Sequence, residues 1–234
     1  METTVAIHQP NYLPWLGYFH KIAAADAFIF LDDAQYSKNS YINRVKILGP
    51  NGPGWLTIPV SYSFGDGIHT VRPAVSDWPN SHLDSLRNLY SHTPAFRAVW
   101  PKLKDLLLGV PQANLAAINR YLVENLCREM NLRCRFLASS DMDVGGKRRD
   151  DRLVSLVATI HPTATYLSGK GAADYQDPEK YRKAGLGFRY VNFLHPRYDQ
   201  GRATFEAGLS IVDPLLRIGL SATAELISKS VVAA

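Results

Sequence analysis

Two short apolar runs near the start of the chain constrain the fold more than any other feature. Residues 5–7 end in a turn that contains Pro10 and Pro14, and residues 27–31 end at Asp32. The prolines exclude a helix across the turn, but the segment between the turn and the second run can be helical. A strand, a crossover helix and a second strand form a right-handed βαβ unit with parallel strands. The opening of the chain therefore predicts an α/β fold.

Later segments extend this prediction. Residues 55–62 and 68–75 are predicted to pair as an antiparallel hairpin added to the sheet, because residues 64–67 form a glycine-containing turn. Residues 41–48 fit either a strand or a short helix. Apolar residues at helical spacing predict helices at 80–90, with Asn80 or Ser81 as its cap, at 96–107, with a kink at Pro101, and at 115–130. Further strands are predicted at 133–139, 165–167 and 186–193, and further helices at 151–160, 178–184 and within 214–230.

These elements together predict a Rossmann-like, mainly parallel sheet flanked by helices, with an antiparallel hairpin and a helical insertion. We expect residues 1–79 to form an N-terminal α/β half and residues 80–131 a helical insertion or subdomain. Residues 132–234 are expected to form a C-terminal α/β half that completes the same domain.

Composition indicates a globular protein in the cytoplasm. Hydrophobic residues make up 46% and charged residues 20% of the 234 positions. No apolar run is long enough to span a bilayer, and no export signal is visible at the N-terminus. Cys127 and Cys134 are the two cysteines, and we expect both to be reduced packing residues.

The net charge of +5 leaves the nature of the partner open. A modest excess of Lys and Arg can serve solubility alone. It also suits a polyanionic partner such as a nucleotide sugar, ATP or the acceptor end of a tRNA.

Three residues are candidates for catalysis, because open parallel sheets bind ligands at the carboxyl ends of their strands. His8 follows the first strand, and its neutral imidazole could take a proton from an attacking amine. Asp32 follows the second strand and could orient an amine, a ribose hydroxyl or a histidine tautomer. His195 follows a later strand and could reach the same edge. The alternative is that all three only form hydrogen bonds in turns.

A larger set is expected to bind substrate. Lys38 and Arg44 suit a phosphate or carboxylate, and the glycine-containing loops at Lys147 and Ser168 could present backbone N–H groups to an anion. Core aromatic residues, a solvated basic loop and plain turns are the alternatives. The predicted substrate-binding residues are Gln9, Asn11, Tyr12, Trp15, His20, Asp33, Gln35, Lys38, Asn43, Arg44, Lys147, Ser168, Gly169, Tyr198 and Gln200. No histidine or cysteine spacing predicts a metal site.

Several motifs resemble the WbqC-like protein family. They are His8-Gln9-Pro10-x-Tyr12-Leu13-Pro14-Trp15-x-Gly17-Tyr18-Phe19-x-Lys21, Asp32-x-x-Gln35-Tyr36-x-Lys38-x-x-x-x-Asn43-Arg44, Trp55-Leu-Thr-Ile-Pro59-Val60, Tyr166-Leu-Ser-Gly169, Phe193-x-His195-Pro196-x-Tyr198-x-Gln200 and Leu209-Ser-Ile-x-Asp213. The resemblance implies a role with surface-polysaccharide (O-antigen) genes, and for some members a transfer of glycine onto an amino sugar. The turn is also similar to the His-x-Gly-His turn of class I synthetase-like nucleotidyl transferases, but Tyr18 stands where the second histidine belongs.

The residues and the resemblance together predict an N-acyl transferase, such as a glycyl transferase. It would form an amide on the amine of an amino sugar nucleotide or a similar small metabolite. The activated acyl donor would be an aminoacyl-tRNA or would be made with ATP. Two alternatives stay open: an ATP-dependent ligase or nucleotidyl transferase, and a non-catalytic nucleotide-sugar-binding protein.

Overall fold

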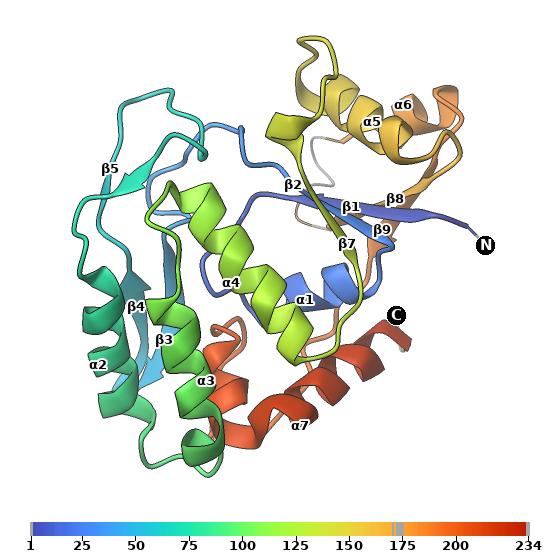
Figure 1. The fold of residues 1–234 in the computed structure, drawn as a ribbon. Coiled ribbons are helices and arrows are strands. Elements are labelled where there is room, and N and C mark those ends of the chain that lie inside the picture. The colour runs from blue at the N-terminus through green and yellow to red at the C-terminus, as the bar shows by residue number, and fades with distance from the viewer. Residues whose placement is uncertain (1, 170, 172–175, 233–234) are drawn as a thin grey trace.

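A five-stranded parallel sheet lies at the centre of the molecule (Figure 1). The computed structural model describes residues 2–169, 171 and 176–232. The strands are β1 (Thr4–His8), β2 (Ala27–Phe30), β7 (Arg135–Ala138), β8 (Thr165–Gly169) and β9 (Gly187–Val191). The predicted Rossmann-like α/β fold is confirmed.

The order of the strands reverses between β1 and β8. Across the sheet the order is β7-β2-β1-β8-β9, so the chain builds outward from β1 in one direction and then returns to its other side. Pairing of β1 with β2 continues to His8, opposite Phe30, but pairing of β1 with β8 ends at Ala6, opposite Leu167. In sheets of this kind, ligands bind outside the carboxyl ends of the strands at the point of reversal.

Alternate side chains of the strands pack into two separate cores. Val5 and Ile7 pack with residues of α5 (Arg149–Ile160) and α6 (Pro178–Lys183), whereas Ala6 belongs to the cluster that includes α1 (Leu16–Ala23) and α7 (Val212–Val232). Figure 1 shows these two pairs of helices on opposite faces of the sheet. Helix α1 is buried from Leu16 to Ile22, because the sheet covers one side of it and α7 another.

Helix α7 bends at Gly219. The backbone there has φ 89° and ψ 170°, a region that essentially only glycine occupies. Before the bend, the carbonyl of Leu216 accepts a hydrogen bond of 3.2 Å from the N–H of Ala95. After the bend, the helix packs on α1, where the Ser230 hydroxyl lies 2.8 Å from Nδ1 of His20. The prediction of one or two helices in this region is confirmed.

The predicted hairpin is confirmed only in part, because residues 55–57 of its first strand pair with a different segment. Strands β3 (Arg44–Gly49) and β4 (Gly52–Thr57) form a separate antiparallel pair, with Lys46 opposite Trp55. Of the predicted hairpin, only the two-residue strands β5 (Val60–Ser61) and β6 (Arg72–Pro73) pair with each other, and they form a sheet of their own instead of joining the main one. The turn at residues 50–51 lies closer to residues 55–57 along the chain than the turn at 64–67 does, so it closes a shorter loop. Pro59 also lacks the N–H that would be needed to extend β4. The ambiguous segment 41–48 is therefore strand from Arg44.

Three helices lie beside the sheet together with the β3–β4 pair: α2 (Trp78–Tyr90), α3 (Phe96–Leu108) and α4 (Leu115–Glu129). Helix α2 starts earlier than predicted from the caps Asn80 and Ser81, because a proline is tolerated in the first turn. A 3₁₀ turn, η1 (Ser139–Asp141), follows β7. None of the helices in the described part of the chain is long and apolar enough to cross a membrane.

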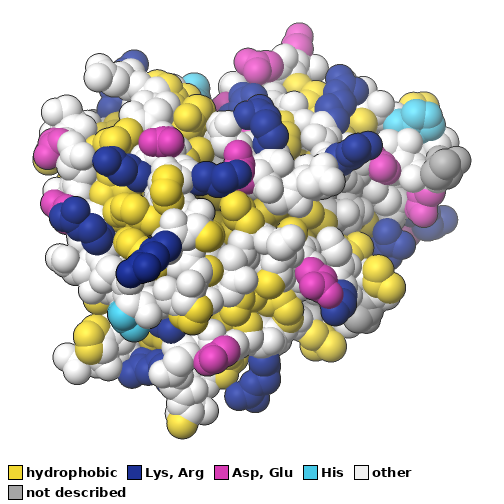
Figure 2. Space-filling view, turned by 60° about the horizontal axis from the view of Figure 1, so that its bottom comes forward, with side chains coloured by type: hydrophobic (Ala, Val, Ile, Leu, Met, Phe, Trp, Pro, Cys, Tyr) yellow, Lys and Arg dark blue, Asp and Glu magenta, His cyan; other side chains and the backbone are white. Residues whose placement is uncertain are grey.

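Charged side chains are mixed on the surface. Figure 2 shows Lys and Arg side chains dispersed among Asp and Glu on the face it presents, with apolar side chains between them. The excess positive charge on that face is therefore spread out, with no single basic patch.

Candidate functional site

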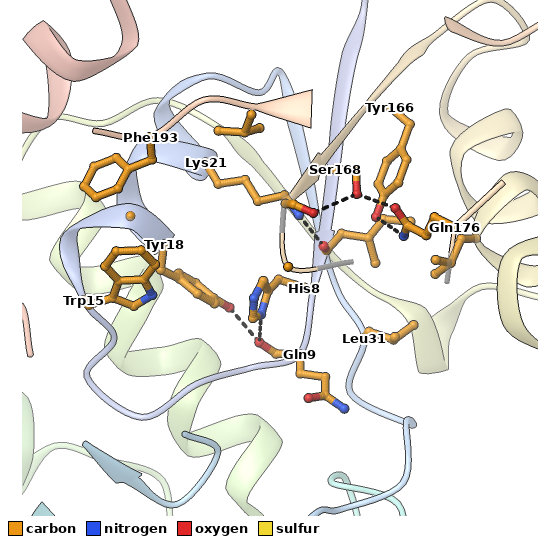
Figure 3. Close-up of a pocket in the computed structure, with 16 residues that line it drawn as sticks. His8, Gln9, Trp15, Tyr18, Lys21, Leu31, Tyr166, Ser168, Gln176 and Phe193 are labelled. Atoms are coloured by element: carbon orange, nitrogen blue, oxygen red, sulfur yellow. Dashed lines mark hydrogen bonds between the residues drawn. The ribbon is translucent and has the colours of Figure 1, made fainter. Parts of the chain in front are cut away.

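A cavity of about 750 Å³ opens where β1 and β8 stop pairing (Figure 3). Its walls come from the ends of β1 and β8, the start of α1, the chain after β9 and the first turns of α5. The cavity therefore occupies the place where a parallel sheet with this strand order binds ligands. Among its described lining residues, none is Asp or Glu.

Aromatic side chains form one wall of this cavity. The indole of Trp15 packs edge-on against Phe193, with ring centroids 5.1 Å apart, and stacks with His195 at 6.1 Å. A side chain on Gly17 would clash with that indole, because its Cβ would lie 2.5 Å from the ring. The absence of a side chain at this position lets Trp15 fold over the start of α1.

His8 presents an unprotonated nitrogen to the cavity. Its Nδ1 lies 3.0 Å from the carbonyl oxygen of Gln9, which can only accept, so Nδ1 carries the proton and Nε2 holds the lone pair (Figure 3). Within the described residues Nε2 has no hydrogen-bond partner. Burial, reinforced by the charge of Lys21, lowers the pKa of His8 to about 4, so the ring is neutral at pH 7.

Lys21 is the second titratable group of the cavity, and sequence reasoning did not select it. Its Nζ donates a 2.8 Å hydrogen bond to the carbonyl oxygen of Ile7, at the point where β1 leaves β8 (Figure 3). The residue is 6% exposed, and burial lowers its pKa to about 7. No described carboxylate forms an ion pair with it. The available signal was a lysine in a helix whose neighbours on every side are apolar or aromatic.

The wall from β8 carries neutral polar groups. The Ser168 hydroxyl donates to Oε1 of Gln176, and Nε2 of Gln176 donates to the Tyr166 hydroxyl at 3.3 Å (Figure 3). The ring of Tyr166 lies 5.8 Å from Nζ of Lys21. The cavity thus combines an uncharged imidazole, a buried amine and neutral hydrogen-bonding groups.

Five of the predicted site residues line this cavity: His8, Gln9, Trp15, Ser168 and Gly169. His195 lies behind Trp15 and is not part of the lining. Its Nδ1 donates to the carbonyl of Pro196 at 3.0 Å, and its buried Nε2 has no partner among the described residues. Burial lowers the pKa of His195.

The two aspartates after β2 face the other neighbour of that strand, β7. Asp32 accepts hydrogen bonds from the Ser139 hydroxyl at 3.1 Å, the Ser140 N–H at 2.9 Å and the Ser140 hydroxyl at 2.7 Å. Asp33 accepts from Ser139 and pairs with Arg152. Burial acts to raise the pKa of Asp33, but these partners outweigh it and the pKa is lowered. Among the described residues, no hydrogen bond joins the side chains of His8 and Asp32, and Asp32 is not part of the cavity lining.

Most of the other predicted binding residues have partners within the protein. The Tyr12 hydroxyl lies 2.7 Å from Nδ1 of His82, and the Tyr36 hydroxyl donates to Asn43 at 2.9 Å. The other side-chain partners are Ser230 for His20, Asn39 for Arg44, Ser155 for Lys147, Asp213 for Tyr198 and Glu206 for Gln200. Gln35 is exposed, and its backbone bridges that of Gly67. Asn11 is buried and Lys38 is exposed, and neither lines the cavity.

Comparison with known proteins gives two findings. A family model described as the WbqC-like protein family matches residues 9–225. The uncharacterized protein Rv1507c of Mycobacterium tuberculosis is 32% identical over 221 residues, which cover 93% of this chain and 95% of that protein. The matched range includes all the described lining residues of the cavity except Ile7 and His8, which directly precede it. On this match, the chain belongs to the WbqC-like protein family.

Proposed function

We propose that this protein transfers an acyl group, such as glycyl, onto the amine of an amino sugar or a similar small metabolite. The observation that carries this proposal is the pair His8 and Lys21 in one cavity without a described carboxylate. Near neutral pH the imidazole is neutral and the amine is close to half protonated, since their pKa values are about 4 and about 7. Such a site can accept a proton from an attacking amine.

The two groups divide the proton transfer. The substrate nitrogen attacks the acyl carbon, the bond from that carbon to the leaving group breaks, and the nitrogen loses one proton. Nε2 of His8 has its lone pair free to accept this proton as the bond forms. With a pKa of about 4 the imidazole cannot keep the proton at pH 7, whereas Lys21, at about 7, can hold it and return it to the leaving group.

The donor is best supplied already activated. Among the described lining residues the one side chain that can carry a full positive charge is Lys21, and the basic residues Lys38, Arg44 and Lys147 lie outside the cavity. A volume of about 750 Å³ lies in the range of small-molecule pockets and fits an amine together with an aminoacyl end. An aminoacyl-tRNA could insert its acceptor end and leave its phosphates outside, which favours it over glycine with ATP.

The test is product formation by the purified protein. We would incubate it with an amino-sugar nucleotide and glycyl-tRNA, and in parallel with glycine and ATP, and follow the acceptor by mass spectrometry. We expect a glycyl addition with wild type and a loss of about 100-fold or more in His8→Ala, the range for a lost general base. His92→Ala, at an exposed residue outside this cavity, is the matched control and should keep full activity.

Three outcomes would contradict the proposal. One is that no amine gains mass with any aminoacyl or acyl donor. Another is that His8→Ala keeps wild-type turnover. Pyrophosphate release from ATP in the absence of an acyl acceptor would instead favour a ligase or nucleotidyl transferase.

A further inference from the structure

A second cavity, of about 740 Å³, lies on a different part of the molecule and shares no described lining residue with the first. It is bounded by the β3–β4 turn, the connection between α2 and α3, residues 199–202 and the first half of α7. Nothing in the proposed acyl transfer uses it. A ligand bound there would therefore be independent of the acyl transfer.

One side chain of this cavity, Arg217, is held in place by a buried carboxylate. Asp213 is completely buried, and its carboxylate accepts hydrogen bonds from the hydroxyls of Tyr90 at 2.9 Å and Tyr198 at 2.8 Å. It also accepts from Nε of Arg217 at 3.1 Å, one helical turn further along α7. Tyr90 in turn accepts from the N–H of Leu48 at 2.9 Å. The guanidinium is therefore fixed in orientation before any ligand arrives.

Most of the hydrogen-bonding capacity of Arg217 is unused. A guanidinium has five N–H donors, and only the one on Nε has an acceptor in the described protein. The side chain is nine-tenths buried, with 10% exposed, yet Nη1 and Nη2 are not among the buried atoms that lack a partner, so they remain open to the cavity. A fixed planar fork with free Nη donors matches an oxyanion that can accept two parallel hydrogen bonds.

The charges and walls of the cavity select the kind of oxyanion. Two guanidinium groups, Arg202 and Arg217, stand against two carboxylates, Asp199 and Asp213, so their formal charges cancel. A dianion would bring two uncompensated charges, whereas a monoanion brings one. Leu48, Leu89 and Ile218 add apolar surface to the walls. We infer that this cavity is a second ligand site, which binds a small carboxylic acid with its carboxylate on Nη1 and Nη2 of Arg217 and its apolar part against these walls.

The first experiment compares three probes on the full-length protein. Isovalerate supplies a carboxylate on a branched apolar body, isovaleramide is its neutral analogue, and inorganic phosphate is a compact oxyanion. In NMR titrations of isotope-labelled protein, we expect isovalerate to saturate one site and to perturb the amide signals of Gly201 and Arg217. The affinity for isovaleramide should be lower than that for isovalerate by about tenfold or more, because charge-assisted hydrogen bonds are about twice as strong as neutral ones.

Variants then test whether the fork is responsible. Arg217→Lys keeps the positive charge near Asp213 but loses the planar pair of donors, and should weaken isovalerate binding about tenfold. The matched control is Arg120→Lys, which changes another i,i+4 ion pair, with Glu124 on α4, outside both cavities. Its binding should equal wild type.

A second variant covers the case in which Arg217→Lys does not fold. Gly201→Ala changes neither Arg217 nor Asp213 and places a methyl group 3.3 Å from Nη1, so it should also weaken binding; at φ 65° an alanine costs about 1 kcal/mol, so its folding is checked first. Three results would overturn the inference: no saturable binding of isovalerate to wild type, unchanged binding in the folded variants, or phosphate binding more tightly than isovalerate.

Discussion

The carboxyl ends of β1 and β2 are neighbours in the sheet, yet they differ in how their polar groups are used. After β2, Asp32 accepts three hydrogen bonds from Ser139 and Ser140. At the end of β1, Nε2 of His8 has no partner among the described residues, and Lys21 has one carbonyl and no carboxylate. A polar residue at a sheet edge is therefore a candidate for chemistry only where its hydrogen-bonding groups are left open to a cavity.

The largest effect is expected from Lys21→Met, which removes the amine from the cavity. If Lys21 holds the transferred proton, the rate of amide formation falls about 100-fold or more. Stability near pH 7 should not fall, because the variant removes an amine whose charge is disfavoured by burial, and this offsets the loss of the donor to the Ile7 carbonyl. Product formation and urea unfolding measure the two effects, and wild-type turnover in this variant would assign Lys21 a structural role alone.

Asp32→Ala should have the opposite profile. The N–H and hydroxyl of Ser140 lose their acceptor, whereas Ser139 keeps Asp33, so the free energy of unfolding should fall by about 2 kcal/mol. Activity per folded molecule should be unchanged, since Asp32 does not line the cavity. Asp84→Ala is the control: it breaks an exposed ion pair with Arg87 and should cost about 0.5 kcal/mol or less. A large fall in activity without a fall in stability would return Asp32 to the candidate catalytic residues.

The pH dependence of stability should report on the two titratable groups at the end of β1, His8 and Lys21. Lys21 has a pKa of about 7 when folded and an ordinary value of 10.5, so between these values the unfolded chain binds more protons and wild-type stability rises with pH. His8 gives the same sign between about 4 and 6.5. Denaturant unfolding across pH should show both rises in stability for the wild type. The rise between pH 7 and 10.5 should be absent in Lys21→Met, and the rise between pH 4 and 6.5 should be absent in His8→Gln. Parallel curves for wild type and either variant would show that the corresponding group is not shifted.

The smallest effect concerns a predicted binding residue that has a protein partner. Tyr12→Phe removes the hydroxyl that bonds Nδ1 of His82, leaving that nitrogen without its partner. The free energy of unfolding should fall by about 1 kcal/mol, and turnover should stay at the wild-type level. An increase in KM with unchanged stability would instead place Tyr12 at the substrate.

Local patterns predicted the elements around the site, and distant contacts set the rest. The buried strands β1 and β2 and the helix between them follow from apolar runs within a short segment. The saturation of Asp32 depends on Ser139, more than a hundred positions away, and no local pattern reports it. Lys21 was overlooked for a similar reason, because a lysine is usually exposed and its burial depends on the sheet and α7.

The same reasoning explains why residues 55–57 pair with β3 instead of with their predicted partner. Residues 55–62 alternate as a strand does, and both flanking turns offer a way to close an antiparallel pair. Alternation identifies a strand but does not identify its partner. The shorter loop at residues 50–51 and the missing N–H of Pro59 decide which segment becomes the partner, and the hydrophobic pattern contains neither of these.

The bend at Gly219 allows one helix to join two halves of the molecule. The residues before it hold Ala95 at the start of α3 and carry Arg217, whereas those after it cover α1, which bears Lys21. Any other amino acid would be disfavoured at φ 89°, and a straightened helix could not keep both attachments. The walls of both cavities thus depend on a backbone geometry that only one residue type readily supplies, so a change there would disturb two distant sites together.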